Sequence, residues 1–73
     1  MREVLIARVH FPPDGHDLTL ATGVDLAASR EIRVVVPPEE VLGVLAALHD
    51  GKQPVIEIHD FDVADWTGWW QEV

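Results

Sequence analysis

Four histidines and thirteen acidic residues are the groups in this chain that could form a metal site. Imidazole beside carboxylate is a usual environment for zinc or iron. The densest run is His-Asp-Phe-Asp at residues 59–62, but neighbouring strand residues point to opposite faces, and no spacing matches an i, i+4 histidine pair on a helix. We therefore predict no metal site and no cofactor. The alternative is a metal-binding protein whose ligands are His10, Asp17 and His59.

Acid–base catalysis has one candidate pair, Glu57 and His59, which share one face of a predicted strand. Catalysis also needs a pocket and perturbed pKa values, and a chain of 73 residues has little room for a pocket. The chain contains no cysteine, and its only serine, Ser29, does not lie in a recognisable nucleophile motif. We predict that the protein is not an enzyme.

The C-terminal end combines aromatic and acidic residues and is the strongest functional signal in the chain. Three tryptophans lie within five residues, and tryptophan is enriched at the energetic centres of protein interfaces. An alternative is that these rings fold back to cover an undersized core. Both uses can coexist. We predict a partner-binding surface made of aromatic and acidic residues from this end: Phe61, Asp62, Asp65, Trp66, Trp69 and Trp70.

The charge of the chain is strongly acidic and unevenly distributed. The net charge is −8, and residues 53–73 hold five acidic residues and no lysine or arginine. Direct binding to nucleic acid is not expected, because that affinity comes from cationic side chains, and the tryptophans also lack nearby cations for base stacking. We expect a protein partner with a basic or apolar surface. An alternative is an inhibitor of a DNA- or RNA-binding protein whose carboxylates (Glu57, Asp60, Asp62 and Asp65) imitate phosphates.

Size and composition favour one small domain that associates with a second copy. Residues 1–73 are expected to form a single domain, without disulfides because cysteine is absent. Apolar residues make up 48% of the chain, and exposed apolar patches often mark interfaces, so we expect a homodimer. The longest uncharged run, at residues 41–49, is too short to span a membrane, and no signal peptide is recognisable. We expect a cytoplasmic protein.

Periodicity predicts an α+β fold of about four mostly antiparallel strands packed against one central helix at residues 38–50. Residues 2–11, 17–22, 31–36 and 55–61 read as strands. A parallel arrangement of the last two around the helix is an alternative, since a right-handed crossover would join them. The Trp-rich C-terminus is expected to form a short helix or an extended segment packed across the sheet.

Alternation assigns Ile32, Val34 and Val36 to the core face of the third strand, and Ile56 and Ile58 to one face of the fourth. For the first strand, Val4 and Ile6 share one face. Apolar residues on both of its faces favour a central position in the sheet.

Residue types predict a hairpin turn and the end of the helix. Pro-Pro-Asp-Gly at residues 12–15 favours a four-residue hairpin loop that places His10 opposite Asp17, although a three-residue loop with a bulge would shift this pairing by one. Gly51 is expected to end the helix in a left-handed conformation. Residues 23–29 are then a connector.

The predicted helix should begin at Pro38 and bury one stripe of side chains. Pro-Glu-Glu at residues 38–40 suits a first helical turn. Gly43 costs about 1 kcal/mol relative to alanine inside a helix, so we expect it to lie against a sheet or a second helix. The expected buried stripe is Val41, Leu42, Leu45 and Leu48, with Val44 beside it.

Overall fold

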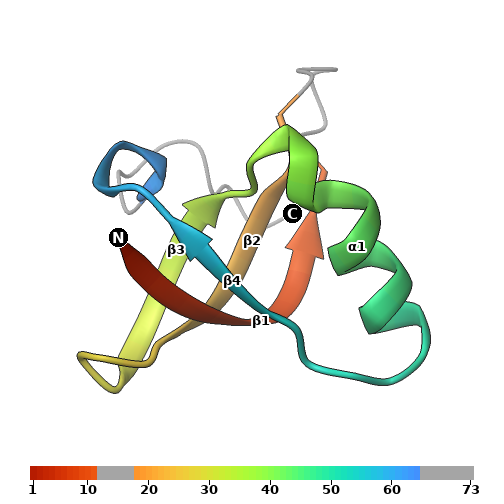
Figure 1. The fold of residues 1–73 in the computed structure, drawn as a ribbon, viewed down its shortest axis with the longest axis horizontal. Helices are drawn as coiled ribbons and strands as arrows, with labels where there is room; N and C mark the ends of the chain where they lie inside the picture. Colours follow the sequence, from red (N-terminus) through yellow and green to blue (C-terminus); the bar gives the residue numbers. More distant parts are fainter. Residues whose placement is uncertain (12–17, 65–73) are drawn as a thin grey trace.

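The computed structural model describes residues 1–11 and 18–64 and confirms the α+β fold. A four-stranded antiparallel sheet in the order β3-β2-β1-β4 packs against one helix (Figure 1). The elements are β1 (Arg2–His10), β2 (Leu20–Asp25), β3 (Arg30–Val35), α1 (Pro38–His49), β4 (Val55–Ile58) and the short 3₁₀ helix η1 (Asp60–Asp62). As expected, β1 is central. The parallel alternative is wrong, because β4 pairs antiparallel with β1 at the far side of the sheet from β3.

The sheet curls so strongly that the chain beyond β4 returns to the outer edge of β3. Val63 forms an isolated antiparallel bridge with Val34, and the N–H of Ala64 donates to the carbonyl of Arg33 at 2.7 Å. Ala64 is fully buried. The segment that follows β4 is therefore anchored beside β3, and it partly closes the sheet into a barrel-like shape (Figure 1).

A β-bulge in β1 changes which residues face the core. The register with β2 shifts between Ile6 and Arg8. In a regular strand, only residues an even number of positions apart share a face. Ile6 faces the core before the shift and Val9 packs against the core after it, although they are three positions apart. A bulge inserts one extra residue and so reverses the alternation of faces.

The predicted hairpin register is wrong for the same region. His10 pairs with Leu20 and not with Asp17, which lies outside the described residues. The second strand starts three residues later than expected and runs on to Asp25, so residues 23–25 are strand and not connector. The turn at residues 26–29 then leads into β3, with Ser29 at a φ of 53°.

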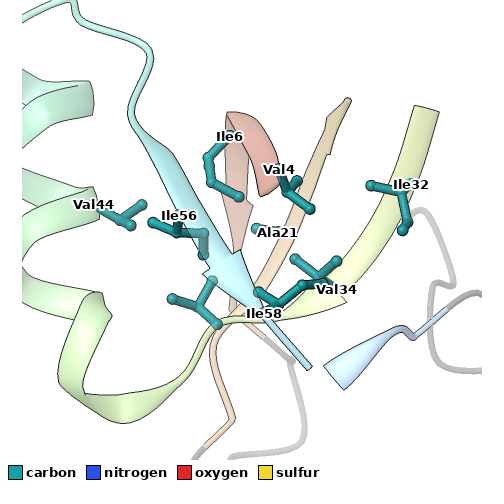
Figure 2. Packing of buried hydrophobic residues seen from close by; sticks show 9 residues of the cluster. Val4, Ile6, Ala21, Ile32, Val34, Val44, Ile56 and Ile58 are labelled. Atoms are coloured by element: carbon teal, nitrogen blue, oxygen red, sulfur yellow. The ribbon is translucent and has the colours of Figure 1, made fainter. Parts of the chain in front are cut away.

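The core lies between the concave side of the sheet and α1 (Figure 2). The expected core faces of the third and fourth strands are confirmed. The buried cluster takes residues from every strand and from the helix: Val4, Ile6, Ala21, Ile32, Val34, Val36, Val44, Ile56 and Ile58.

The predicted buried stripe of the helix is correct at Val41 and Leu48 and wrong at Leu42. Val44 is the fully buried residue of α1, with Val41 and Leu48 partly buried beside it. Leu42 is 82% exposed, and a Cβ at Gly43 would meet no atom within 4 Å. Positions 41, 44 and 48 follow helical spacing, but nearly every residue from 41 to 48 is apolar, so several phases fit the sequence equally well.

The ends of α1 form as their residue types predict. Pro38 is in the first turn, with two glutamates after it, and Gly51 has a φ of 76°. The N–H of Gly51 donates to Leu48 O at 3.0 Å, and that of Lys52 donates to Ala47 O at 2.8 Å. These bonds give partners to two of the last carbonyls of the helix. Among the described residues no helix is long and apolar enough to cross a membrane.

Candidate interaction surface

The chain leaves the sheet after Ile58 and makes a compact turn, η1, where the sequence predicted continued strand to Phe61. The carboxylate of Asp62 accepts a hydrogen bond from the backbone N–H of His59 at 3.0 Å. The backbone N–H of Asp62 donates to His59 O at 2.9 Å, and that of Val63 donates to Asp60 O at 3.2 Å. These bonds close the turn, and its central residue, Phe61, lies on the outside.

Phe61 is one of the most exposed large apolar residues described, at 82%. Its ring stacks on the imidazole of His59 with a centroid distance of 5.0 Å and an interplanar angle of 13°. Asp60 and Asp62 flank it in the turn, Asp60 exposed and Asp62 half-buried. An apolar ring bordered by carboxylates suits contact with a protein surface that is apolar at its centre and basic around it.

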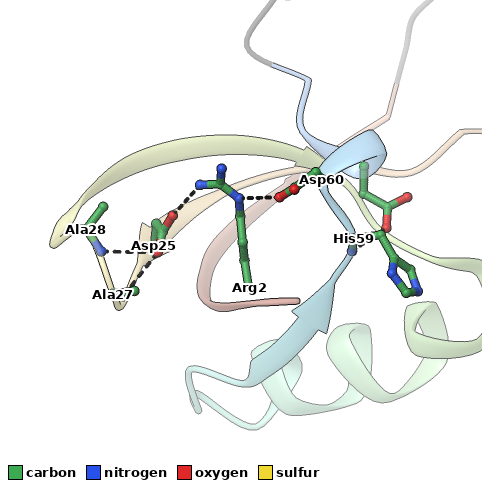
Figure 3. Close-up of polar contacts among 7 residues, drawn as sticks. Arg2, Asp25, Ala27, Ala28, His59 and Asp60 are labelled. Carbon is green, nitrogen blue, oxygen red and sulfur yellow. Dashed lines mark hydrogen bonds and ion pairs between the residues drawn. The ribbon is translucent and has the colours of Figure 1, made fainter.

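Arg2 holds this turn from the first residue of β1 (Figure 3). Its Nε donates to Asp60 Oδ1 at 2.8 Å and its Nη1 to Asp25 Oδ2 at 2.8 Å. Asp25 is 1% exposed, and its other oxygen accepts the N–H groups of Ala27 and Ala28 at 3.0 and 3.2 Å. One guanidinium therefore joins β1, the end of β2 and η1.

These contacts shift the pKa values of all three ionisable groups. The hydrogen bond from the Ala28 N–H lowers the pKa of Asp25, helped by Arg2 and Ala27 and opposed by the burial of the carboxylate. The hydrogen bond from Arg2 lowers the pKa of Asp60. In turn, Asp60 and then Asp25 raise the pKa of Arg2. Each shift favours the charged form, so the cluster is ionised near neutral pH.

A shallow hollow lies beside this cluster. It is lined by the N-terminal residues of β1, the turn after β2 and Asp60. Two exposed apolar side chains, Met1 and Leu26, lie at its border and are 77% and 44% exposed. The hollow therefore combines the charged groups of the cluster with two exposed apolar side chains.

Two of the six predicted partner-binding residues lie in the described part of the chain. Phe61 and Asp62 are neighbours in η1, and Phe61 is exposed as an interface residue requires. The other four lie outside the described residues: Asp65, Trp66, Trp69 and Trp70.

Sequence reasoning missed Arg2 and Asp25. Asp25 precedes a turn and accepts the N–H groups two and three residues on, which is a common local use of aspartate, so this part was detectable. The partners of Arg2 are 23 and 58 residues away, and no local pattern points to them.

The histidines and carboxylates of the described residues do not assemble a metal site. In residues 1–11 and 18–64, no three such side chains come together. Nε2 of His10 lies 3.1 Å from Oγ1 of Thr22, whereas the ring of His59 stacks on Phe61. Asp17, the third residue of the alternative ligand set, lies outside the described residues. For the proposed acid–base pair, Glu57 is exposed on β4 and His59 lies beyond the end of that strand.

Comparison with known proteins adds no family to this geometry. No family model matches the chain, and no similar protein was found among curated proteins or among solved structures.

Proposed function

We propose that this protein is a small, acidic, non-enzymatic interaction module that binds protein partners through its aromatic, acidic C-terminal surface and forms a homodimer. The observation that carries the proposal is the exposed ring of Phe61, held on the outside of a defined turn. In the core, by contrast, apolar side chains from every strand and the helix are covered.

Burial of this ring against a partner would contribute substantially to the free energy of binding. A phenylalanine side chain presents roughly 200 Å², and Phe61 is 82% exposed. Its burial at an interface is therefore worth about 4 kcal/mol before the entropy losses of association are subtracted. A ring that contributes this much is a suitable anchor for an interface.

The carboxylates near the ring are expected to determine which partners bind more than how tightly they bind. The chain carries a net charge of −8, so a basic partner is attracted and an acidic one is repelled. The phosphate-mimic alternative is less well supported, because the carboxylates of Asp60 and Asp62 are already bonded within the molecule, to Arg2 and to the His59 N–H.

Self-association can be tested by light scattering at tens of micromolar protein. We expect a wild-type dimer that dissociates more readily when Phe61→Ala or the pair Trp69→Ala and Trp70→Ala is introduced. Leu42→Ala is the matched control, because Leu42 is also 82% exposed but lies on α1, away from η1 (Figure 1). A monomeric wild type, or variants that remain fully dimeric, would contradict the homodimer.

The sign of the salt dependence distinguishes the two kinds of partner. Two copies of a chain with charge −8 repel each other, so added salt should strengthen the homodimer by screening that repulsion. Binding to a basic protein should weaken under the same conditions. Neither form of association should respond to Leu42→Ala, and an equal response to Leu42→Ala and Phe61→Ala would refute the proposed surface.

A further inference from the structure

We infer that Arg2 is a positioning residue for the Phe61 surface: its bond to Asp60 fixes η1, and with it the exposed ring, against the end of the sheet. The consequence for binding rests on the proposed function, whereas the positioning of η1 does not.

The turn itself is shaped by local contacts, including the bond from the His59 N–H to the Asp62 carboxylate. None of the three residues of η1 is buried, and the backbone bonds that shape it run between residues 59 and 63. Its neighbours on either side are firmly placed, since Ile58 and Ala64 are both fully buried. Between these points, the bond from Arg2 Nε to Asp60 ties the turn to β1.

Arg2 is itself held from the opposite side. Its Nη1 bonds the buried carboxylate of Asp25, whose second oxygen is bound by two backbone N–H groups of the β2–β3 turn. A guanidinium is planar and offers donors in two fixed directions, whereas an ammonium is a single point of charge. Arginine can therefore connect both carboxylates with good geometry, as Figure 3 shows.

The bond to Asp60 can be broken without endangering the fold. The side chains of Arg2 and Asp60 are 39% and 84% exposed, and exposed ion pairs contribute little to global stability. Loss of this bond should change the placement of η1 while the rest of the sheet stays intact.

The test compares Asp60→Asn with Glu57→Gln, which removes one exposed carboxylate from nearby β4 without a described bond to Arg2. Amide hydrogen exchange at Asp62 and Val63 reports local opening of η1. We expect Asp60→Asn to speed exchange at both amides by about two- to fivefold, the range typical of an exposed ion pair. Arg2→Lys should do the same, and Glu57→Gln should leave both amides as in the wild type.

Unchanged exchange in Asp60→Asn, or equal acceleration in Glu57→Gln, would overturn the positioning role. The same ion pair is absent from the unfolded chain, so its loss should also lower the melting temperature of Asp60→Asn relative to Glu57→Gln, by about 8 °C or less. A larger fall would show that Asp60 supports the whole fold and not the turn alone.

Binding separates the two proposals. If Phe61→Ala weakens the dimer and Asp60→Asn weakens it by about two- to fivefold, both stand. If the wild type does not associate but Asp60→Asn still loosens η1, the proposed function fails and the positioning role stands. If Phe61→Ala weakens the dimer and Asp60→Asn alters neither exchange nor association, the positioning role fails alone.

Discussion

Replacing Gly23 by alanine should destabilise this protein by about 3 kcal/mol or more, whereas the same replacement at Gly43 should stabilise it by about 1 kcal/mol. Both changes add one methyl group, so the opposite signs come from their surroundings. An ideal Cβ at Gly23 would lie 2.2 Å from the carbonyl oxygen of Leu5 and 3.0 Å from a methyl group of Val4. At Gly43 it would meet nothing within 4 Å.

The size of the effect at Gly23 follows from how far the strands must separate. Ordinary van der Waals contact starts at 3.4 Å, so β1 and β2 would have to move apart by about 1 Å. The obstacle is backbone, which cannot turn aside as a flexible side chain can. Overpacking of this kind costs about 1–3 kcal/mol, and each ladder hydrogen bond stretched beyond its range adds about 1 kcal/mol.

The expected loss is a large part of the total stability, which is roughly 4–11 kcal/mol for a chain of this length at typical values per residue. At Gly43 the gain comes from the better helix propensity of alanine, and it should raise the melting temperature by about 4–8 °C.

Thermal and urea unfolding followed by circular dichroism measure both variants against the wild type. Gly23→Ala with wild-type stability would show that the close approach of β1 and β2 is wrong. A loss of stability in Gly43→Ala would show that this face of α1 is covered.

Three further predictions concern acid, the core and the helix. The pKa values of Asp25 and Asp60 are lowered in the fold, so the unfolded chain binds more protons between the folded and unfolded pKa values. The contribution of these two carboxylates to the free energy of unfolding should therefore be complete at pH values above the ordinary pKa of 3.8. It should decrease as the pH falls below that value. Urea unfolding measured at several pH values should show that the free energy of unfolding falls less with acid in Asp25→Asn than in the wild type. Ile58→Ala removes a fully buried side chain and should cost about 2–5 kcal/mol by urea unfolding. Leu42→Ala should change stability by less than about 0.5 kcal/mol, and a larger loss would place Leu42 in contact with the core.

Elements with a clear local pattern were predictable. Alternation placed Ile32 and Val34 in the core of β3, and the change of period after them located α1. These properties depend on neighbours a few positions apart, so the sequence is sufficient to read them. Phe61 was assigned to a partner-binding surface because an aromatic ring among acids is a local signal, and that assignment stays a prediction.

The tertiary structure decided the features that depend on how distant segments meet. The sequence does not show which face of α1 is buried, because the helix carries apolar residues on all sides. Only its packing against the curled sheet makes Val44 the buried residue. The bulge in β1 and the curl of the sheet likewise set the register of β2 and explain why Gly23, and not Gly43, is the tightly packed glycine.

The candidate site divides in the same way. Its composition, an aromatic ring among carboxylates with no cation after residue 52, is a property of the sequence alone. Its placement is not, because Arg2 joins carboxylates that lie 23 and 58 residues away in the chain. Such a contact forms only when the sheet has curled far enough to bring the end of β2 and the turn after β4 to the same residue, and no local pattern of residue types encodes that closure.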